Sequence, residues 1–178
     1  MADSHLKHIT EVTLATHHNS PAADIWCAVD KAVSAIFPYQ LFTISVYDQA
    51  SGTTCRLYTT RHDVQPLGAR KQVTESTWSK HVLQDGKQFL GSSIEELKCF
   101  SEWEFLQGIG CESVLNTPIR SNETGSVVGT LNILGKAHAY DNAPVELAVV
   151  LAQLVSGVIN ASREEILSRP FQGKMETV

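Results

Sequence analysis

The sequence lacks the excess of basic residues that marks a nucleic-acid-binding protein. Its 178 residues include 14 Lys and Arg against 19 Asp and Glu, so the formal net charge at pH 7 is −5. Binding to nucleic acid needs a basic stripe or patch, and we therefore expect no nucleic-acid partner. Long hydrophobic runs are missing as well. The charge-free stretch Leu147–Ser162 has 16 residues and includes Gln153 and Asn160, so it is too short and too polar to span a membrane.

Cysteine is sparse. The four cysteines, at positions 27, 55, 99 and 111, form no Cys-x-x-Cys metal pair and no dense disulfide framework. The first residues carry Asp3, Lys7 and His8 where a signal peptide would have its apolar core. Thiols in a chain without an export signal stay reduced. We therefore expect a cytoplasmic protein.

The length and the order of the expected elements predict one α+β domain. Domains hold roughly 150 residues, which favours a single unit over 1–178. We expect its core at about 20–168 and mobile ends at 1–19 and 169–178. Along the chain the expected elements are a helix, paired strands, a mixed middle, paired strands and a final helix.

Two hairpins are the clearest β-structure. Residues 41–48 alternate apolar and polar side chains, and after a turn residues 53–60 form the returning strand. Residues 113–120 and 126–134 form the second hairpin across a Gly-containing turn. Pro118 has no backbone N–H to donate, which predicts a sheet edge or a bulge at that point.

Helices are expected around the hairpins. Ser20-Pro21 is a typical helix start, with Ser as the cap, and the helix ends before Pro38. Residues 4–16 show a weaker helical spacing. Between the hairpins, Thr74 can cap a short helix that ends at Asp85-Gly86, and 93–107 fits one or two helical turns.

The final helix, expected from Pro144 to about Ser168, carries two apolar stripes. The stripe expected to cover the sheet comprises Leu147, Val150, Leu151, Leu154, Val158 and Ala161. The second stripe comprises Val145, Ala148, Val149, Ala152, Ser156 and Ile159. A helix on one core needs an apolar arc of only about 100°, and this arc is about twice as wide. We expect a second copy of the chain to cover the second stripe, or residues 4–16 to fold back over it.

The pattern of the second half resembles the GAF domains. The resemblance lies in the run SVLNTPIRSNETGSVVGTLNIL, followed by HAYDNAPVELAVVLAQLVSGVINA, and depends on Pro118, Gly125 and Gly129. Upstream, TWSKHVLQDGKQFLG resembles the short helix, glycine and strand that precede this pattern. The resemblance implies a central antiparallel sheet with the terminal helices on one face. Short helices and loops would cover a ligand pocket on the other face.

The middle segment supplies candidate ligand-binding residues. Small-molecule sites are largely apolar pockets with a few polar groups. The residues expected around the pocket are Tyr58, Trp78, His81, Phe100, Trp103 and Cys111. An equally weighted interpretation is that these aromatics only plug the sheet. Asn116, Thr130 and Asn132 lie in otherwise apolar strands. A buried amide is costly without a partner, so each of them meets a hydrogen-bond partner or faces a polar cavity.

The cysteines leave an enzymatic alternative open. Free-methionine-R-sulfoxide reductases share the GAF fold, and this resemblance would make Cys111 catalytic and Cys99 its partner through a sulfenic acid. The sequence departs from that family where Glu112-Ser113-Val114 directly follows Cys111. We therefore predict no catalytic residue unless this alternative holds.

Metal ligands and cofactor motifs are lacking. The candidate histidines are His5, His8, His17 and His18, in a polar segment without thiols or carboxylates at ligand spacing. A metal site needs three or four convergent ligands, so we predict none. No sequence feature identifies a cofactor.

The sequence thus predicts a small-molecule-binding sensor or signalling module without its own output domain. We expect it to act through a separate effector protein and to form a homodimer through the C-terminal helix. Two alternatives stay open: a thiol enzyme similar to free-methionine-R-sulfoxide reductase, and a dimeric scaffold with a filled pocket.

Overall fold

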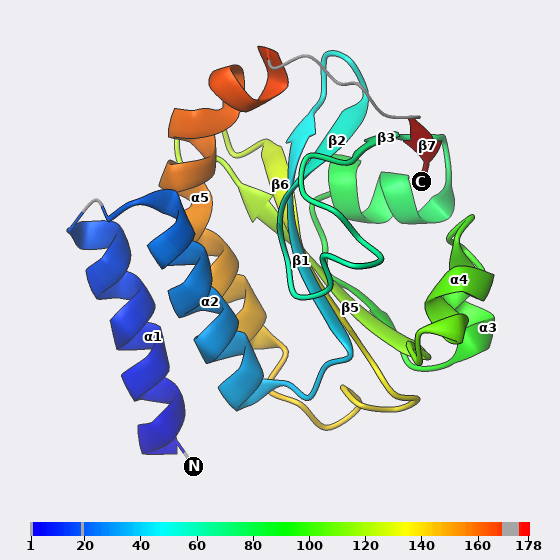
Figure 1. Ribbon diagram of the computed structural model, residues 1–178, viewed down its shortest axis with the longest axis horizontal. Coiled ribbons are helices and arrows are strands. Elements are labelled where there is room, and N and C mark those ends of the chain that lie inside the picture. Colours follow the sequence, from blue (N-terminus) through cyan, green and yellow to red (C-terminus); the bar gives the residue numbers. More distant parts are fainter. Residues whose placement is uncertain (1, 19, 169–174) are drawn as a thin grey trace.

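The computed structural model describes residues 2–18, 20–168 and 175–178, and the expected tail residues 169–174 lie outside them. These residues form a curled sheet of seven strands in the order β4-β5-β6-β1-β2-β3-β7 (Figure 1). The strands are β1 (Leu41–Asp48), β2 (Thr53–Thr59), β3 (Arg70–Gln72), β4 (Phe89–Gly91), β5 (Ser113–Arg120), β6 (Val127–Gly135) and β7 (Glu176–Thr177). The helices are α1 (Ala2–His17), α2 (Ala22–Ile36), the π-helix η1 (Ser79–Gln84), α3 (Ile94–Leu97), α4 (Trp103–Gly108) and α5 (Glu146–Ser168).

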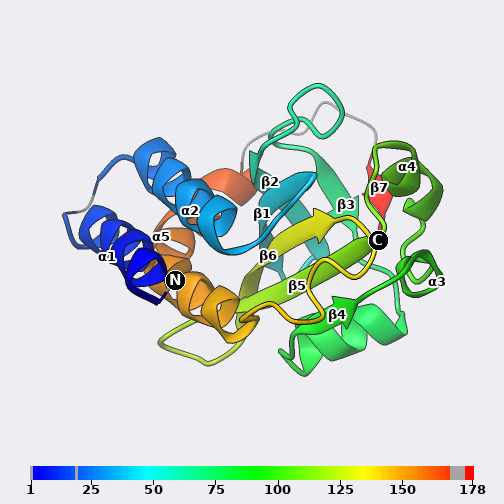
Figure 2. The ribbon, with the colours of Figure 1, turned by 90° about the horizontal axis from the view of Figure 1, so that it is seen from below.

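The sheet separates two layers. The long helices α1, α2 and α5 lie on one face, and η1, α3 and α4 lie on the other (Figure 2). The strands pair antiparallel throughout the two hairpins and at β4 and β3, whereas β7 pairs parallel with β3. This is the α+β architecture that the sequence predicted, with both hairpins in the expected places.

The stripe of α5 that faces the sheet is not the expected one. The helix buries Ala148, Leu151, Ala152, Val155, Ser156 and Ile159, which include most of the second stripe. Val149 and Val150 remain 45% and 40% exposed. The reason is close packing, because small side chains let the helix approach the sheet at Gly129. A Cβ there would collide with the carbonyl oxygen of Ser45 and lie 3.3 Å from Cδ1 of Ile159.

The N-terminal helix packs inside the same chain. α1 contacts both α2 and α5, and its Val12 is fully buried. The helix expected at 4–16 is therefore present and partly covers α5, but it does not cover the second stripe, which faces the sheet. The mobility expected for residues 1–19 stays a prediction, as do the domain limits.

Two expected caps are wrong, whereas the role of Pro118 is confirmed. Pro21 takes the cap position of α2 without a side-chain hydrogen bond, and the hydroxyl of Thr74 donates to the carbonyl of Val178. Strand β4 pairs only with the part of β5 before Pro118, so this proline has no strand neighbour on that side among the described residues. The register shifts directly after Ile119.

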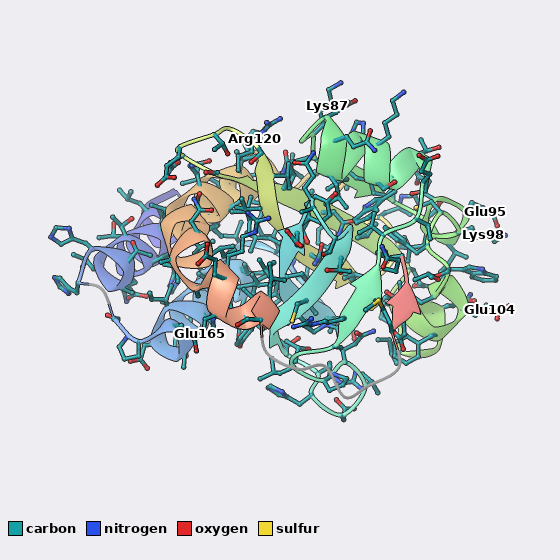
Figure 3. All side chains as sticks on the ribbon, turned by 90° about the horizontal axis from the view of Figure 1, so that it is seen from above. Lys87, Glu95, Lys98, Glu104, Arg120 and Glu165 are labelled. Atoms are coloured by element: carbon teal, nitrogen blue, oxygen red, sulfur yellow. The ribbon has the colours of Figure 1, made fainter. Side chains whose placement is uncertain are left out.

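Many charged side chains, among them Lys87, Glu104 and Arg120, lie around the rim of the molecule (Figure 3). Arg120 connects two turns there, because its guanidinium donates to the carbonyls of Asp85, Gly86 and Gly125. None of the helices in the described ranges is long and apolar enough to cross a membrane.

Candidate functional site

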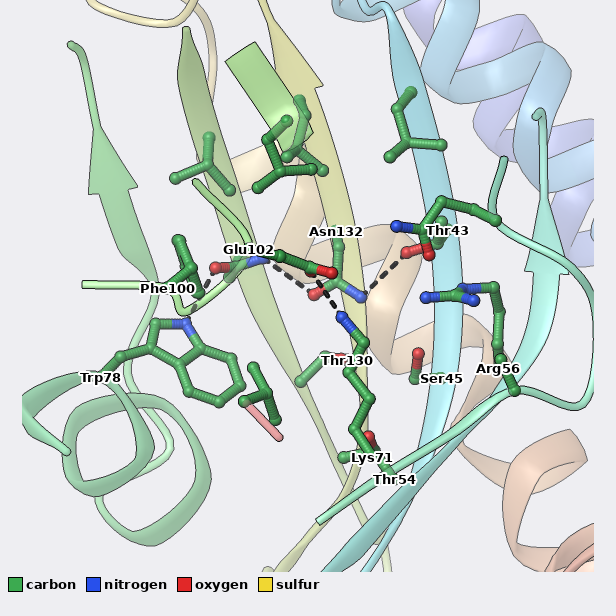
Figure 4. Close-up of a pocket in the computed structure, with 18 residues that line it drawn as sticks. Thr43, Ser45, Thr54, Arg56, Lys71, Trp78, Phe100, Glu102, Thr130 and Asn132 are labelled. Atoms are coloured by element: carbon green, nitrogen blue, oxygen red, sulfur yellow. Dashed lines mark hydrogen bonds and ion pairs between the residues drawn. The ribbon is translucent and has the colours of Figure 1, made fainter. Parts of the chain in front are cut away.

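A cavity of about 80 Å³ lies between the sheet and its cover of short helices and loops (Figure 4). Strands β1, β2, β5 and β6 form its floor. Apolar side chains close one end, with Trp78, Phe100 and Leu106 on the cover side. Val178, directly after β7, also lines the cavity. The site therefore combines residues from the middle of the sheet with one that follows its edge strand β7.

The floor is polar because strand alternation puts every second side chain on one face. Strand pairing aligns these side chains in two rows. Thr130, Ser45 and Arg56 lie opposite one another across β6, β1 and β2. Asn116, Asn132 and Thr43 form the next row across β5, β6 and β1.

The second row is a hydrogen-bonded relay that begins at the cover. The indole Nε1 of Trp78 donates to Oδ1 of Asn116 at 2.9 Å. Asn116 donates to Oδ1 of Asn132 at 2.8 Å, and Asn132 donates to Oγ1 of Thr43 at 3.1 Å. Both predicted alternatives hold together: the asparagines have partners and also line the cavity.

Three charged side chains line the same cavity. The ammonium of Lys71 forms an ion pair with Glu102 at 2.5 Å. Arg56 is only 8% exposed and donates from Nη1 to the carbonyl of Pro66 at 3.2 Å. Its Nε is buried without a hydrogen-bond partner in the described part of the chain. Burial lowers the pKa of Arg56, and the charges of Glu102 and Glu176 act in the opposite direction.

The cavity gathers two of the six predicted ligand-binding residues. Trp78 and Phe100 line it with their rings 5.6 Å apart in a T-shaped contact. Tyr58 is bonded to Asp30 of α2, on the opposite face of the sheet. His81 is bonded to the carbonyl of Gln88, and Trp103 packs beside Lys98. Neither of these two side chains is part of the cavity lining.

The predicted cysteine pair also lies away from the cavity lining. Cys111 is fully buried, Cys99 is exposed, and both are free thiols. Burial raises the pKa of Cys111 to about 12. The Cys99 residue is exposed at the surface, but partial desolvation of its thiol and the charge of Glu96 raise its pKa to about 11. Thiolate is the reactive form, and a raised pKa disfavours it at both side chains.

Sequence reasoning missed the charged groups. Arg56 and Lys71 each occupy a strand position whose face depends on the pairing register, and Glu102 directly precedes α4. The available signal was alternation. Thr43 and Ser45 alternate with apolar residues on β1, and Arg56 lies between Cys55 and Leu57 on β2. These polar strand residues belong to the same face of the sheet as Asn116, Thr130 and Asn132, which the sequence had already indicated as polar positions.

No family model matches the sequence, and no curated protein matches it. Solved structures match in fold. The GAF domain of a phosphoenolpyruvate-protein phosphotransferase from Coxiella burnetii has a TM-score of 0.70 at 16% identity, over 92% of this chain and 97% of that chain. The GAF domain of a two-component sensor histidine kinase from Bacillus halodurans has a TM-score of 0.61 at 19% identity, over 84% of this chain and 99% of that chain.

The chromophore-binding domain of a bacteriophytochrome from R. palustris is similar too. Its TM-score is 0.66 at 11% identity, over 92% of this chain and 62% of that chain. At these identities the likeness concerns the fold. The central sheet, the helical layer on one face, the covered cavity on the other and these similarities together show that the chain has the GAF fold.

Proposed function

We propose that this domain is a sensor that binds a small molecule in the cavity beneath Trp78 and Phe100. The observation that carries the proposal is the cavity itself, which has a polar floor and an aromatic wall within a GAF fold. Small-molecule sites combine apolar walls with a few placed polar groups in this way. The volume of about 80 Å³ limits the ligand to a few heavy atoms, since a cavity of roughly 150 Å³ holds benzene.

The structural neighbours support a signalling role. One is the GAF domain of a sensor histidine kinase, and another is a chromophore-binding domain. The cavity favours a sensor over a scaffold with a filled pocket. The raised pKa values of Cys111 and Cys99 count against the thiol enzyme.

Signal output and assembly are part of the same proposal. The ligand-bound domain acts on an effector protein, and its four free cysteines fit a reducing cytoplasm. A homodimer through α5 would use the exposed Val149 and Val150 because the small residues of the helix face the sheet.

A ligand screen with two readouts tests the sensor proposal. A hit from a library of small metabolites should raise the melting temperature and change the tryptophan fluorescence saturably. Ligand at about 100 times its dissociation constant stabilises the folded state by roughly 2.7 kcal/mol. The variant Trp78→Phe should weaken the response, whereas Trp103→Phe, outside the cavity lining, should leave it unchanged. A screen without any shift contradicts the proposal.

A further inference from the structure

Arg56 is a buried cation whose hydrogen-bonding capacity is only partly used. Its guanidinium points into the cavity near Ser45 (Figure 4). Nη1 is bonded to the carbonyl of Pro66, but the buried Nε has no hydrogen-bond partner within residues 2–18, 20–168 and 175–178. The other buried Nε without a partner belongs to Arg163, whose guanidinium is paired with Asp48 at 2.7 Å. Arg56 has no such carboxylate.

The charged side chains that line the cavity are two cations, Arg56 and Lys71, and one carboxylate, Glu102. Glu102 is engaged by Lys71 at 2.5 Å, so it influences Arg56 through its charge and not through a hydrogen bond. Glu176 also acts on Arg56 by charge, but its side chain is exposed and lies outside the cavity lining. A buried cation without a bonded counter-charge is unfavourable, so an anion in the cavity would relieve this cost.

Residues with hydroxyl groups lie beside Arg56 in the sheet. Ser45 lies directly opposite Arg56 on β1, and Thr130 lies opposite Ser45 on β6. Thr54 is two residues from Arg56 on the same face of β2. All three residues line the cavity, and each carries a hydroxyl that can donate a hydrogen bond. Together with Arg56 they form a group of donors at one end of the site.

The opposite end is apolar. Trp78, Phe100 and Leu134 line the cavity there, and the relay occupies the N–H of the indole. We propose that the ligand is a small carboxylate whose charged end binds Arg56 and the neighbouring hydroxyls and whose short apolar end contacts Trp78 and Phe100. A guanidinium fork matches a carboxylate in a two-bond geometry. This inference rests on the proposed function and names the chemical class of its ligand.

The cavity adjoins a surface groove beside Arg56. This larger groove of about 1000 Å³ shares Arg56, Gln65, Ala69 and Glu102 with the cavity lining. The loop that precedes β3 and the turn before α4 form its sides. A carboxylate that enters from this groove meets the guanidinium first, and its apolar end can then occupy the inner part of the cavity.

Binding of butyrate compared with neutral butyramide tests the inference. The two molecules have the same shape and differ in charge. At constant ionic strength, with chloride as the balancing anion, we expect butyrate to bind at least about tenfold more tightly than butyramide, because charge-assisted hydrogen bonds are the stronger ones. Tryptophan fluorescence and the melting temperature both report binding. Acetate, which lacks the apolar end, should bind more weakly than butyrate.

Variants assign the anion to Arg56. Arg56→Met should remove the preference for butyrate. Arg61→Met is the matched control because it removes the same charge from an exposed ion pair with Asp63, and it should leave binding unchanged. Thr130→Val removes one of the cavity hydroxyls, and a β-strand tolerates Val well. This variant should weaken butyrate binding, and it keeps the inference testable if Arg56→Met fails to fold.

Several outcomes would overturn the inference. Equal binding of butyrate and butyramide, equal binding of inorganic phosphate, or the same loss in Arg61→Met each contradict it. The absence of carboxylate binding contradicts it as well. If the metabolite screen then finds another ligand that responds to Trp78→Phe, the sensor proposal stands without the carboxylate. If the screen also finds nothing, both proposals fail.

Discussion

The indole N–H of Trp78 donates a hydrogen bond of 2.9 Å to the side-chain oxygen of Asn116. An indole can only donate, so Asn116 must present its oxygen to Trp78 and its amide nitrogen to Asn132. The same logic makes Asn132 donate to Thr43. One tryptophan on the cover therefore orients a whole row of side chains on the cavity floor.

Replacing the residue that links the cover to the floor should destabilise the protein. Asn116→Leu keeps a similar shape but leaves the N–H of Trp78 and the oxygen of Asn132 without these partners. Unsatisfied buried groups cost about 1–3 kcal/mol each, and urea unfolding measures the change. The double variant Trp78→Phe/Asn116→Leu should lose less than the sum of the single variants because the unpaired indole N–H is gone. A fully stable Asn116→Leu variant would contradict the importance of the relay.

The sequence predicts the fold well because the signals that define it are local. Strand alternation, the glycine turns and the prolines determine both hairpins, and Pro118 indicates correctly where β5 loses its neighbour. The helix α5 shows the limit of this reasoning. Both of its stripes are apolar, and periodicity does not say which of them packs on the sheet. Ala148 and Ala152 face the sheet because small side chains allow a closer approach there.

The site is less predictable because it depends on register and on the rotation of short helices. Ser45 and Arg56 become neighbours through strand pairing, directly after a register shift between Ile44 and Ser45. Trp78 and Trp103 look equivalent in the sequence, yet only Trp78 lines the cavity. The strand residue Tyr58 belongs to the opposite face of the sheet, where Asp30 accepts its hydrogen bond.

The native thiols should differ strongly in reactivity. Burial raises the pKa of Cys111 to about 12, so at about pH 8 this thiol stays protonated and inaccessible. We expect iodoacetamide to leave Cys111 unmodified in the folded protein and to label it after unfolding, as mass spectrometry would show. Exposed Cys27 should react in both states. Turnover of free methionine-R-sulfoxide that disappears in Cys111→Ser would instead restore the enzymatic alternative.

Stability should fall in alkaline solution through two tyrosines on the helical side of the sheet. Tyr39 and Tyr58 donate to the two carboxylate oxygens of Asp30 at 2.6 and 2.9 Å. Burial is the largest cause of the raised pKa of each phenol, and Asp30 adds to it. In the unfolded protein these phenols have the ordinary pKa of about 10, and in the folded protein their pKa is higher. Their contribution to the free energy of unfolding is therefore fully present below about pH 10 and is lost as the pH rises toward the folded-state pKa.

The variant Asp30→Asn isolates this effect. It removes the negative charge that holds both phenols protonated, so the free energy of unfolding should decline less steeply above about pH 10 than in the wild type. Urea unfolding at neutral and alkaline pH measures the difference. Asp63→Asn, at an exposed ion pair, is the control and should keep the wild-type slope. An unchanged slope in Asp30→Asn would show that other groups cause the alkaline loss.

Two charge insertions on α5 separate packing within the chain from a dimer contact. Ala152 is buried against the sheet, so Ala152→Glu should unfold or loosen the domain. Val150 is 40% exposed, so Val150→Glu should stay folded and turn a dimer into monomers. Light scattering gives the mass, and circular dichroism gives the folded fraction. A wild-type protein that is monomeric at micromolar concentration would exclude the dimer.

Removing one or the other cavity cation should have opposite consequences for stability. Lys71→Met breaks the ion pair with Glu102 and leaves that carboxylate, whose side chain is 24% exposed, without its partner. We expect a loss of about 1–3 kcal/mol, less than for a fully buried pair because water still reaches Glu102.

Arg56→Met removes a cation that has no bonded counter-charge, and the thioether chain keeps the packing of the aliphatic stem. The ligand-free variant should therefore be at least as stable as the wild type while it loses the preference for carboxylates. Urea unfolding without added carboxylate measures both variants. A loss in Arg56→Met as large as that in Lys71→Met would mean that Arg56 is a structural residue, held by its bond to the carbonyl of Pro66, and not a site kept for a ligand.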